Sequence, residues 1–222
     1  MKFDNFESIN VTKEKENVII MFYGDPSSNP REYELFFNMT DKFQHLHFYY
    51  FSNSSIIQHL NLGEEISFPS IVISKNFDEE INAYTGNITY YDVFQFIRIF
   101  SRPVLSNLNA DSYLYIINER ISFISLLIQD NHPRIEEIKD LYYDLSLKYR
   151  NKLMSFIGNY DELKGTTFTY EFNVKSSDLP IIMIEEFTPE NTIRRYKSVP
   201  RDLESNETIT SFFSSYYEGF LF

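Results

Sequence analysis

The sequence predicts a layered α/β protein made of two tandem domains, each with a central mixed β-sheet flanked by helices. Short apolar runs of the length of buried strands alternate with segments in which apolar residues recur at helical spacing. The same order of strands and helices occurs twice, before and after a break at Ser101-Arg102-Pro103. The 222 residues also suit two domains of about 100 residues each. We therefore predict one domain over residues 1–103 and a second over residues 104–222.

The first domain opens with the apolar run 18–23, which is typical of a strand buried on both faces. Asn29, Pro30 and Glu32 then predict a helix start with a capping box, and the helical pattern continues to Lys42. The later elements are predicted as a strand over 45–51, a helix over 54–62, strands over 70–74 and 80–84, and a helix over 87–100. The order is β-α-β-α-β-β-α, which indicates crossover helices and a mixed sheet.

The second domain repeats this order with different residues. Its strands are predicted over 121–128, 153–157, 180–184 and 192–196, and its helices over 133–149, 167–174 and 206–217.

Composition excludes several classes of function. Lys and Arg number 20 against 32 Asp and Glu, and this net charge of -12 disfavours binding to a nucleic-acid backbone. Cysteine is absent, so the chain can form no disulfide, thiolate nucleophile or thiolate metal site. No apolar run approaches the roughly 18 residues that a membrane span needs. We expect no membrane partner, no cofactor, no metal and no catalysis by this chain.

The loop after the first strand carries a family resemblance. Phe22-Tyr23 leads to Gly24-Asp25-Pro26 and then to Ser27, Ser28, Asn29 and Pro30. This segment resembles the catalytic domains of the protein disulfide isomerases, in which a strand ending in Phe-Tyr leads to Ala-Pro-Trp and then Cys-Gly-His-Cys. Here both cysteines are missing, so the resemblance implies a thioredoxin-like fold with a degenerate active-site loop.

Further segments match the same family at the expected spacing. Pro69 in Phe68-Pro69-Ser70-Ile71 and Pro180 in Leu179-Pro180-Ile181-Ile182 correspond to its cis-proline position. Residues 96–104 are similar to the junction between its two non-catalytic inner domains, b and b′, and residues 208–219 to the closing helix of b′. The chain therefore resembles a b–b′ pair of tandem thioredoxin-like domains.

The resemblance also implies a binding site in the second domain. In the disulfide isomerases b′ provides the main hydrophobic site for unfolded chains, and the corresponding positions here are Leu126, Ile128, Tyr142 and Phe156. Periodicity alone assigns the same four residues to the core. The first domain would then act as a spacer.

The sequence gives weaker support to a serine nucleophile or a zinc site. Ser27, Ser28 and Asn29 are explained by helix capping, because no histidine lies near them in sequence. His45 and His47 would share one face of a strand and could ligate zinc, but no third ligand is indicated.

We expect a non-catalytic, chaperone-like module that binds unfolded or extended polypeptides, and other folding factors, in the lumen of the endoplasmic reticulum. One alternative is the central fragment of a full-length disulfide isomerase whose redox-active domains lie outside the chain. Another is an acidic luminal calcium-binding scaffold of calsequestrin type.

Overall fold

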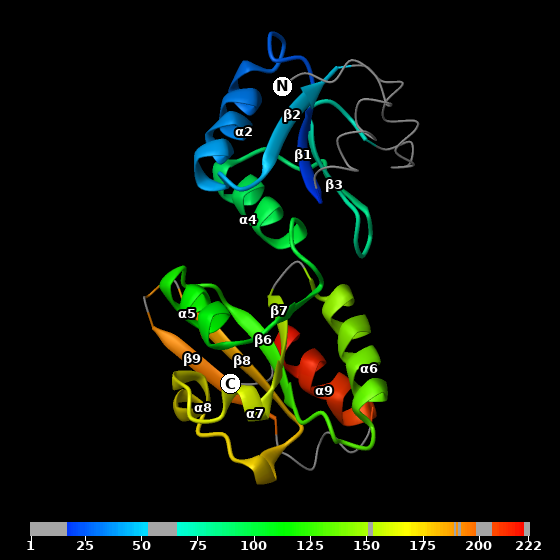
Figure 1. Cartoon of the computed structure of the whole chain (residues 1–222). Coiled ribbons are helices and arrows are strands. Elements are labelled where there is room, and N and C mark those ends of the chain that lie inside the picture. The colour runs from blue at the N-terminus through cyan, green and yellow to red at the C-terminus, as the bar shows by residue number, and fades with distance from the viewer. Residues whose placement is uncertain are drawn as a thin grey trace. The chain divides into compact units, whose positions relative to one another are not determined.

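The computed structural model describes residues 17–52, 66–150, 153–188, 190, 192–198 and 206–219. The chain divides into two compact units, Met1–Pro103 and Val104–Phe222, and each contains its own β-sheet (Figure 1). The mixed α/β architecture with two sheets confirms the predicted fold class.

In the first unit, helices and strands follow the predicted order. Its described elements are β1 (Val18–Tyr23), α2 (Pro30–Lys42), β2 (His47–Phe51), β3 (Ser70–Lys75), β4 (Ile81–Tyr84) and α4 (Tyr90–Phe100). The sheet order is β2-β1-β3-β4, with β1 parallel to β2 and antiparallel to β3. The helix predicted over 54–62 lies outside the described residues.

Strand β1 is buried along its whole length because both of its faces are covered. Its even-numbered residues Val18, Ile20 and Phe22 pack in a cluster with residues of α2 and α4, such as Phe36 and Val93. The odd-numbered residues of β1 contribute to a separate cluster on the opposite face. This alternation explains why the run has no polar position.

Helix α4 begins at Tyr90, three residues later than the sequence predicts. The side chain of Thr89 caps it by accepting a hydrogen bond from the Asp92 backbone N–H at 3.2 Å. Thr89 is extended, so the helical conformation cannot begin before it.

In the second unit the elements are more numerous than predicted. They are β5 (Leu105–Asn107), α5 (Ala110–Asn118), β6 (Phe123–Ile128), α6 (Ile135–Lys148), β7 (Met154–Asn159), α7 (Tyr160–Leu163), α8 (Thr167–Glu171), η1 (Ser176–Asp178), β8 (Ile181–Phe187), β9 (Ile193–Lys197) and α9 (Asn206–Tyr217). The sheet order is β5-β7-β6-β8-β9, parallel from β5 to β6 and antiparallel from β6 to β9.

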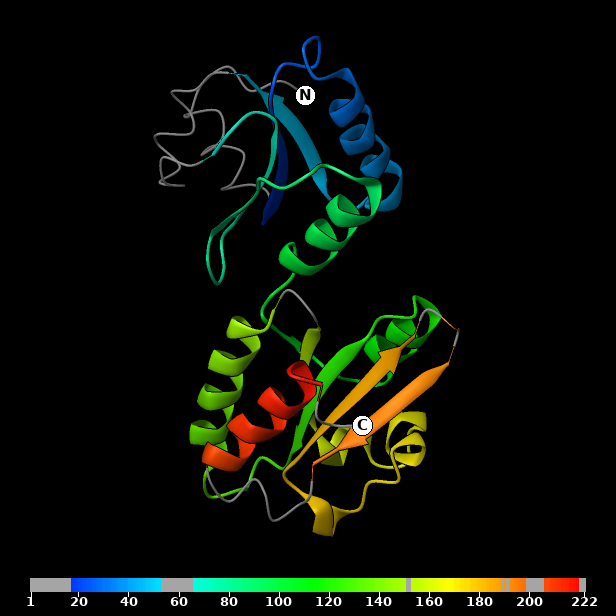
Figure 2. The ribbon, with the colours of Figure 1, turned by 180° about the vertical axis from the view of Figure 1, so that it is seen from behind.

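Helices cover both faces of the second sheet (Figures 1 and 2). Helices α6 and α9 lie side by side on one face, where Ile138, Tyr142 and Phe213 pack on the even-numbered residues of β6. Helices α5 and α8 lie on the other face and contact each other. Strand β5 and helices α5 and α7 were not predicted from the sequence.

Candidate binding site

The degenerate active-site loop of the first unit is closed by its own Asp25. One carboxylate oxygen accepts from the Ser27 backbone N–H at 3.0 Å, and the other accepts from the Ser28 hydroxyl at 2.9 Å. The Asn29 side chain donates to the Asp25 backbone oxygen at 3.2 Å. The predicted capping box is therefore wrong: Asn29 makes no side-chain cap because its amide is turned back to Asp25. Pro30 begins α2, as predicted.

Two proline positions follow the family pattern quoted above. The Phe68–Pro69 and Leu179–Pro180 peptide bonds are both cis. Each proline directly precedes a strand, β3 or β8, that pairs with the strand leading into the corresponding loop.

The four residues predicted to line a hydrophobic cleft are core residues. Leu126 and Tyr142 are completely buried, and Ile128 and Phe156 are 2% exposed. Tyr142 also donates its hydroxyl to the Ile124 backbone oxygen at 3.0 Å inside the core. Burial raises its pKa well above the ordinary value for tyrosine. Because all four side chains are buried, they do not line an open cleft, and the prediction of a cleft at these residues is wrong.

Nor do the four side chains share one side of the sheet. Leu126, Ile128 and Tyr142 pack in the cluster under α6 and α9. Phe156 pairs in register with Ser125, and side chains in register point to the same face, opposite to that of Leu126. Its ring packs edge-on against Phe123, with centroids 5.8 Å apart.

An aromatic layer joins α5 and α8 to that second face. The Tyr113 ring of α5 meets Phe168 of α8 edge-on, with centroids 5.0 Å apart. Phe168 packs against Phe172 at 5.0 Å, and Phe172 lies 6.5 Å from Phe123 of β6. These contacts hold the short helix α8 on the sheet.

A charged network ties the end of α8 to the same face. Arg195 of β9 donates through Nε to Glu185 of β8 at 2.5 Å and contacts Glu171 of α8 at 2.9 Å. The guanidinium also lies over the Phe172 ring, 5.7 Å from its centroid. Glu185 is fully buried, and its Oε1 has no hydrogen-bond partner among the described residues.

Burial dominates the electrostatics of this network. Desolvation raises the pKa of the Glu185 carboxyl, and the hydrogen bond from Arg195 opposes that shift. Desolvation, reinforced by the Glu185 carboxylate, likewise raises the pKa of Tyr113. Arg195 thus pairs with the buried carboxylate of Glu185 and with the partly exposed carboxylate of Glu171.

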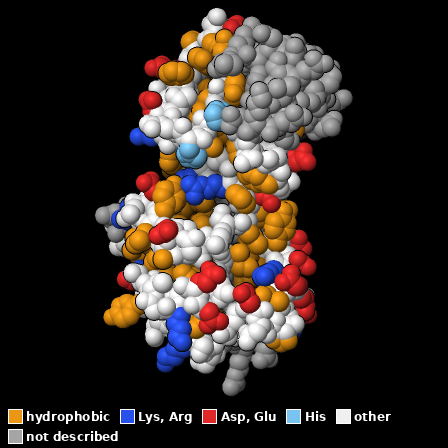
Figure 3. All heavy atoms as spheres, in the orientation of Figure 1, with side chains coloured by type: hydrophobic (Ala, Val, Ile, Leu, Met, Phe, Trp, Pro, Cys, Tyr) orange, Lys and Arg blue, Asp and Glu red, His pale blue; other side chains and the backbone are white. Residues whose placement is uncertain are grey.

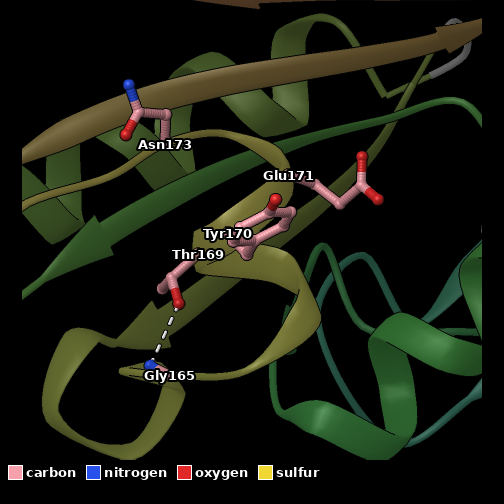
Figure 4. A pocket seen from close by; sticks show the side chains of 5 residues that line it. All are labelled: Gly165, Thr169, Tyr170, Glu171 and Asn173. Carbon is pink, nitrogen blue, oxygen red and sulfur yellow. Dashed lines mark hydrogen bonds between the residues drawn. The ribbon is translucent and has the colours of Figure 1, made fainter.

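The surface end of the network borders an open pocket of about 580 Å³ (Figure 4). Its lining residues come from α8 and the turns beside it: Gly165, Thr169, Tyr170, Glu171 and Asn173. Thr169 is structural, because its hydroxyl accepts from the Gly165 backbone N–H at 3.2 Å. Gly165 has a φ of +81°, which favours glycine. The ring of Tyr170 is left facing solvent at 85% exposure.

Exposed apolar side chains continue on the neighbouring helix. Leu114 and Tyr115 of α5 are 53% and 42% exposed, and hydrophobic side chains reach the surface over α5 and α8 in Figure 3. Sequence analysis missed this surface, although a signal was present. Phe168 and Phe172 are four residues apart on the buried side of a helix, so Tyr170 between them points outward.

The two candidate zinc ligands do not share a strand. Strand β2 starts at His47, which pairs with Ile19, and His45 precedes it in a turn. Across the described ranges, no three His, Asp or Glu side chains gather closely enough to hold a metal ion together. None of the described helices has the length and apolar character that a membrane span requires.

Comparison with known proteins identifies the class to which this fold belongs. The sequence profile of the thioredoxin-like domain family matches residues 4–215, nearly the whole chain. The chain therefore belongs to the thioredoxin-like domain family.

Its relatives narrow that class. A protein disulfide-isomerase of Drosophila melanogaster is 24% identical over 208 residues, which is 93% of this chain and 40% of that protein. The chain thus spans less than half the length of this relative. The match bears out the resemblance to the disulfide isomerases.

Two solved structures share the fold at low sequence identity. The zinc-bound form of human ERp44 superposes with a TM-score of 0.57 and 12% identity, covering the whole chain and 61% of that structure. The bb fragment of ERp72 superposes with a TM-score of 0.54 and 9% identity, covering 99% of this chain and 96% of the fragment. Without cysteine, this chain contains no thiol–disulfide catalytic site.

Proposed function

We propose that the chain is a non-catalytic, chaperone-like module that binds unfolded or extended polypeptides, and that it works in the lumen of the endoplasmic reticulum. The observation that carries the proposal is the exposed Tyr170 ring beside the open pocket on α8. The similarity to a protein disulfide-isomerase supports the setting. The α5–α8 surface, defined by Leu114, Tyr115 and Tyr170, replaces the buried residues inferred from the family resemblance.

Binding without redox chemistry follows from the residues present. Thiol–disulfide exchange needs a thiolate, and the two cysteine positions of the loop hold Ser27 and Pro30. The Ser27 backbone N–H and the Ser28 hydroxyl both donate hydrogen bonds to the Asp25 carboxylate. This loop therefore offers a ligand few hydrogen-bond donors.

The exposed aromatic side chains suit a weak and general polypeptide site. An aromatic ring that leaves water gains about 25 cal/mol for each Å² of apolar area buried, while an extended chain loses conformational freedom when it binds. Micromolar or weaker affinity follows from that balance. Apolar contacts are not directional, which also favours acceptance of many sequences.

A second candidate function is that of one part of a longer enzyme. The chain spans 40% of the disulfide isomerase that it resembles, which favours a central piece of a longer isomerase with redox-active domains elsewhere. The binding surface would then present polypeptides to those domains. Sequencing the gene on both sides of the coding region for residues 1–222 distinguishes this candidate, because CxxC motifs in frame would support it.

The test compares two exposed tyrosines, one in each unit. Tyr170→Ser removes the ring beside the pocket, and Tyr91→Ser removes one on α4 that is 68% exposed. Fluorescence anisotropy of a labelled, permanently unfolded polypeptide should show about tenfold weaker binding to Tyr170→Ser, which corresponds to about 1.4 kcal/mol. Tyr91→Ser should bind like the parent.

Thermal melts followed by circular dichroism should coincide for all three proteins, because both tyrosines are at the surface. Equal affinity of Tyr170→Ser and the parent would contradict the proposed site. Equal losses in both variants would show that binding is spread over the whole surface.

A further inference from the structure

The pocket on α8 has polar groups that a purely hydrophobic site would not need. We infer that it takes a basic side chain of the bound polypeptide, an arginine guanidinium or a lysine ammonium. This inference rests on the proposed binding function and specifies the class of segment that the site prefers.

The first argument is that α8 and the turn after it already hold two cations of this chain. Arg195 contacts the Glu171 carboxylate and lies over the Phe172 ring. Lys197 donates from Nζ to the Asn173 backbone oxygen at 3.4 Å. Both cations reach α8 and its following turn from β9. The Glu171 carboxylate, the Phe172 ring and the Asn173 carbonyl thus already bind cationic groups.

The second argument concerns the acceptors that remain open. Glu171 uses Oε2 for Arg195, and within the described part of the chain its Oε1 accepts no hydrogen bond. The Tyr170 ring lines the same pocket and is 85% exposed (Figure 4). Within one pocket, an aromatic face attracts a cation through its quadrupole and a carboxylate oxygen attracts it through charge.

The third argument is the field in which the pocket lies. The chain carries a net charge of -12, which concentrates cationic segments near its surface and speeds their association. Within the pocket region itself, Arg195 and Lys197 balance Glu171 and Glu185. The preference for a basic residue therefore depends on the free edge of Glu171 and on Tyr170, and these two residues are the ones to test.

The experiment uses two labelled extended peptides that differ at one position, where one has arginine and the other has neutral citrulline of nearly the same shape. Binding to the full chain is measured by fluorescence anisotropy at low and high ionic strength. The arginine peptide should bind roughly three- to tenfold more tightly at low salt, the combined effect of an exposed ion pair and a cation–π contact. The preference should shrink near 1 M salt, where the Debye length is about 3 Å.

Three single substitutions test which residues cause the preference for arginine. Glu171→Gln keeps an oxygen for Arg195 but loses the charge, and Tyr170→Leu keeps apolar surface but loses the aromatic face. Each should remove much of the preference for arginine. Glu162→Gln, an exposed acid on α7, is the matched control and should keep the full preference.

Melting curves of the three variants should coincide with that of the parent. If Glu171→Gln melts at a lower temperature than the parent, the result for Tyr170→Leu is used instead, because Tyr170 is 85% exposed and the ion pairs of Arg195 are made with Glu171 and Glu185.

The outcomes separate the two proposals. If both peptides bind equally well to the parent, the basic-residue inference is wrong and the polypeptide site stands. An arginine preference that persists in both Glu171→Gln and Tyr170→Leu would place the basic residue elsewhere and also overturn the inference. If neither peptide binds, the proposed function fails and the inference fails with it.

Discussion

Replacing Phe156 with Ala distinguishes a core residue from a binding residue. Phe156 is 2% exposed, lies in the middle of β7, and pairs with Ser106 on one side and Ser125 on the other. Its ring closes the aromatic layer against Phe123 at 5.8 Å. Truncating a buried phenylalanine removes its transfer free energy and leaves a cavity, at a cost of about 3–5 kcal/mol. For a unit of this size, the melting temperature should fall by more than about 10 °C.

The assay is thermal and urea unfolding followed by far-ultraviolet circular dichroism, since the chain has no tryptophan. The two units have separate cores, so the loss should fall on the transition of the second unit and leave that of the first unchanged. Tyr170→Ala serves as the surface control and should change stability by less than about 0.5 kcal/mol. A loss below about 1 kcal/mol for Phe156→Ala, together with weakened polypeptide binding, would refute the assignment of Phe156 to the core.

Two further predictions test the second unit. Because burial raises the pKa of Glu185 in the folded chain, the folded state holds this proton more tightly than the unfolded chain does. Its contribution to stability is present at acid pH and is lost as pH rises from the ordinary carboxyl pKa through the raised one. Glu185→Gln should remove that decline in a pH series of urea unfolding, and an unchanged pH profile would contradict the assignment. Gly158→Ala should destabilise by roughly 1–3 kcal/mol, because an added Cβ would lie 2.7 Å from Leu163 Cδ1 and 3.1 Å from the Leu108 backbone oxygen. A melt like that of the parent would show that Leu163 moves aside at little cost.

Hydrophobic pattern predicted most of the fold because the strands of each sheet centre are buried on both faces. The runs at β1, β3 and β6 contain no exposed position. The sequence shows β1 and β6 as unbroken or nearly unbroken apolar stretches, and β3 as a short apolar run between polar residues. Strand β5 has only three residues, too few for any periodicity to be recognised. The start of α5 is set by reciprocal hydrogen bonds between Asn109 and Ser112, a capping box formed by residues other than the usual Ser/Thr and Glu/Gln.

The binding surface was less predictable than the core. Periodicity assigns Leu126, Ile128 and Tyr142 to a buried face, and the structure agrees, whereas the family resemblance pointed to a cleft. Arg195 and Glu185 are ten positions apart and meet only because β8 and β9 pair in that register. No local pattern in a single sequence reports such a cross-strand pair.

The charged network also explains how a helix as short as α8 can hold a surface residue in place. Five residues are too few for an isolated helix to be stable, so α8 depends on its tertiary contacts. Removing a carboxylate from water is costly, and a buried ion pair therefore adds little net stability, yet it penalises arrangements in which the pair is broken. Arg195 bridges the buried Glu185 to Glu171, the last residue of α8, and Phe168 of the same helix packs against Tyr113 of α5. Together these contacts hold α8 on the sheet, with Tyr170 exposed at the edge of the pocket.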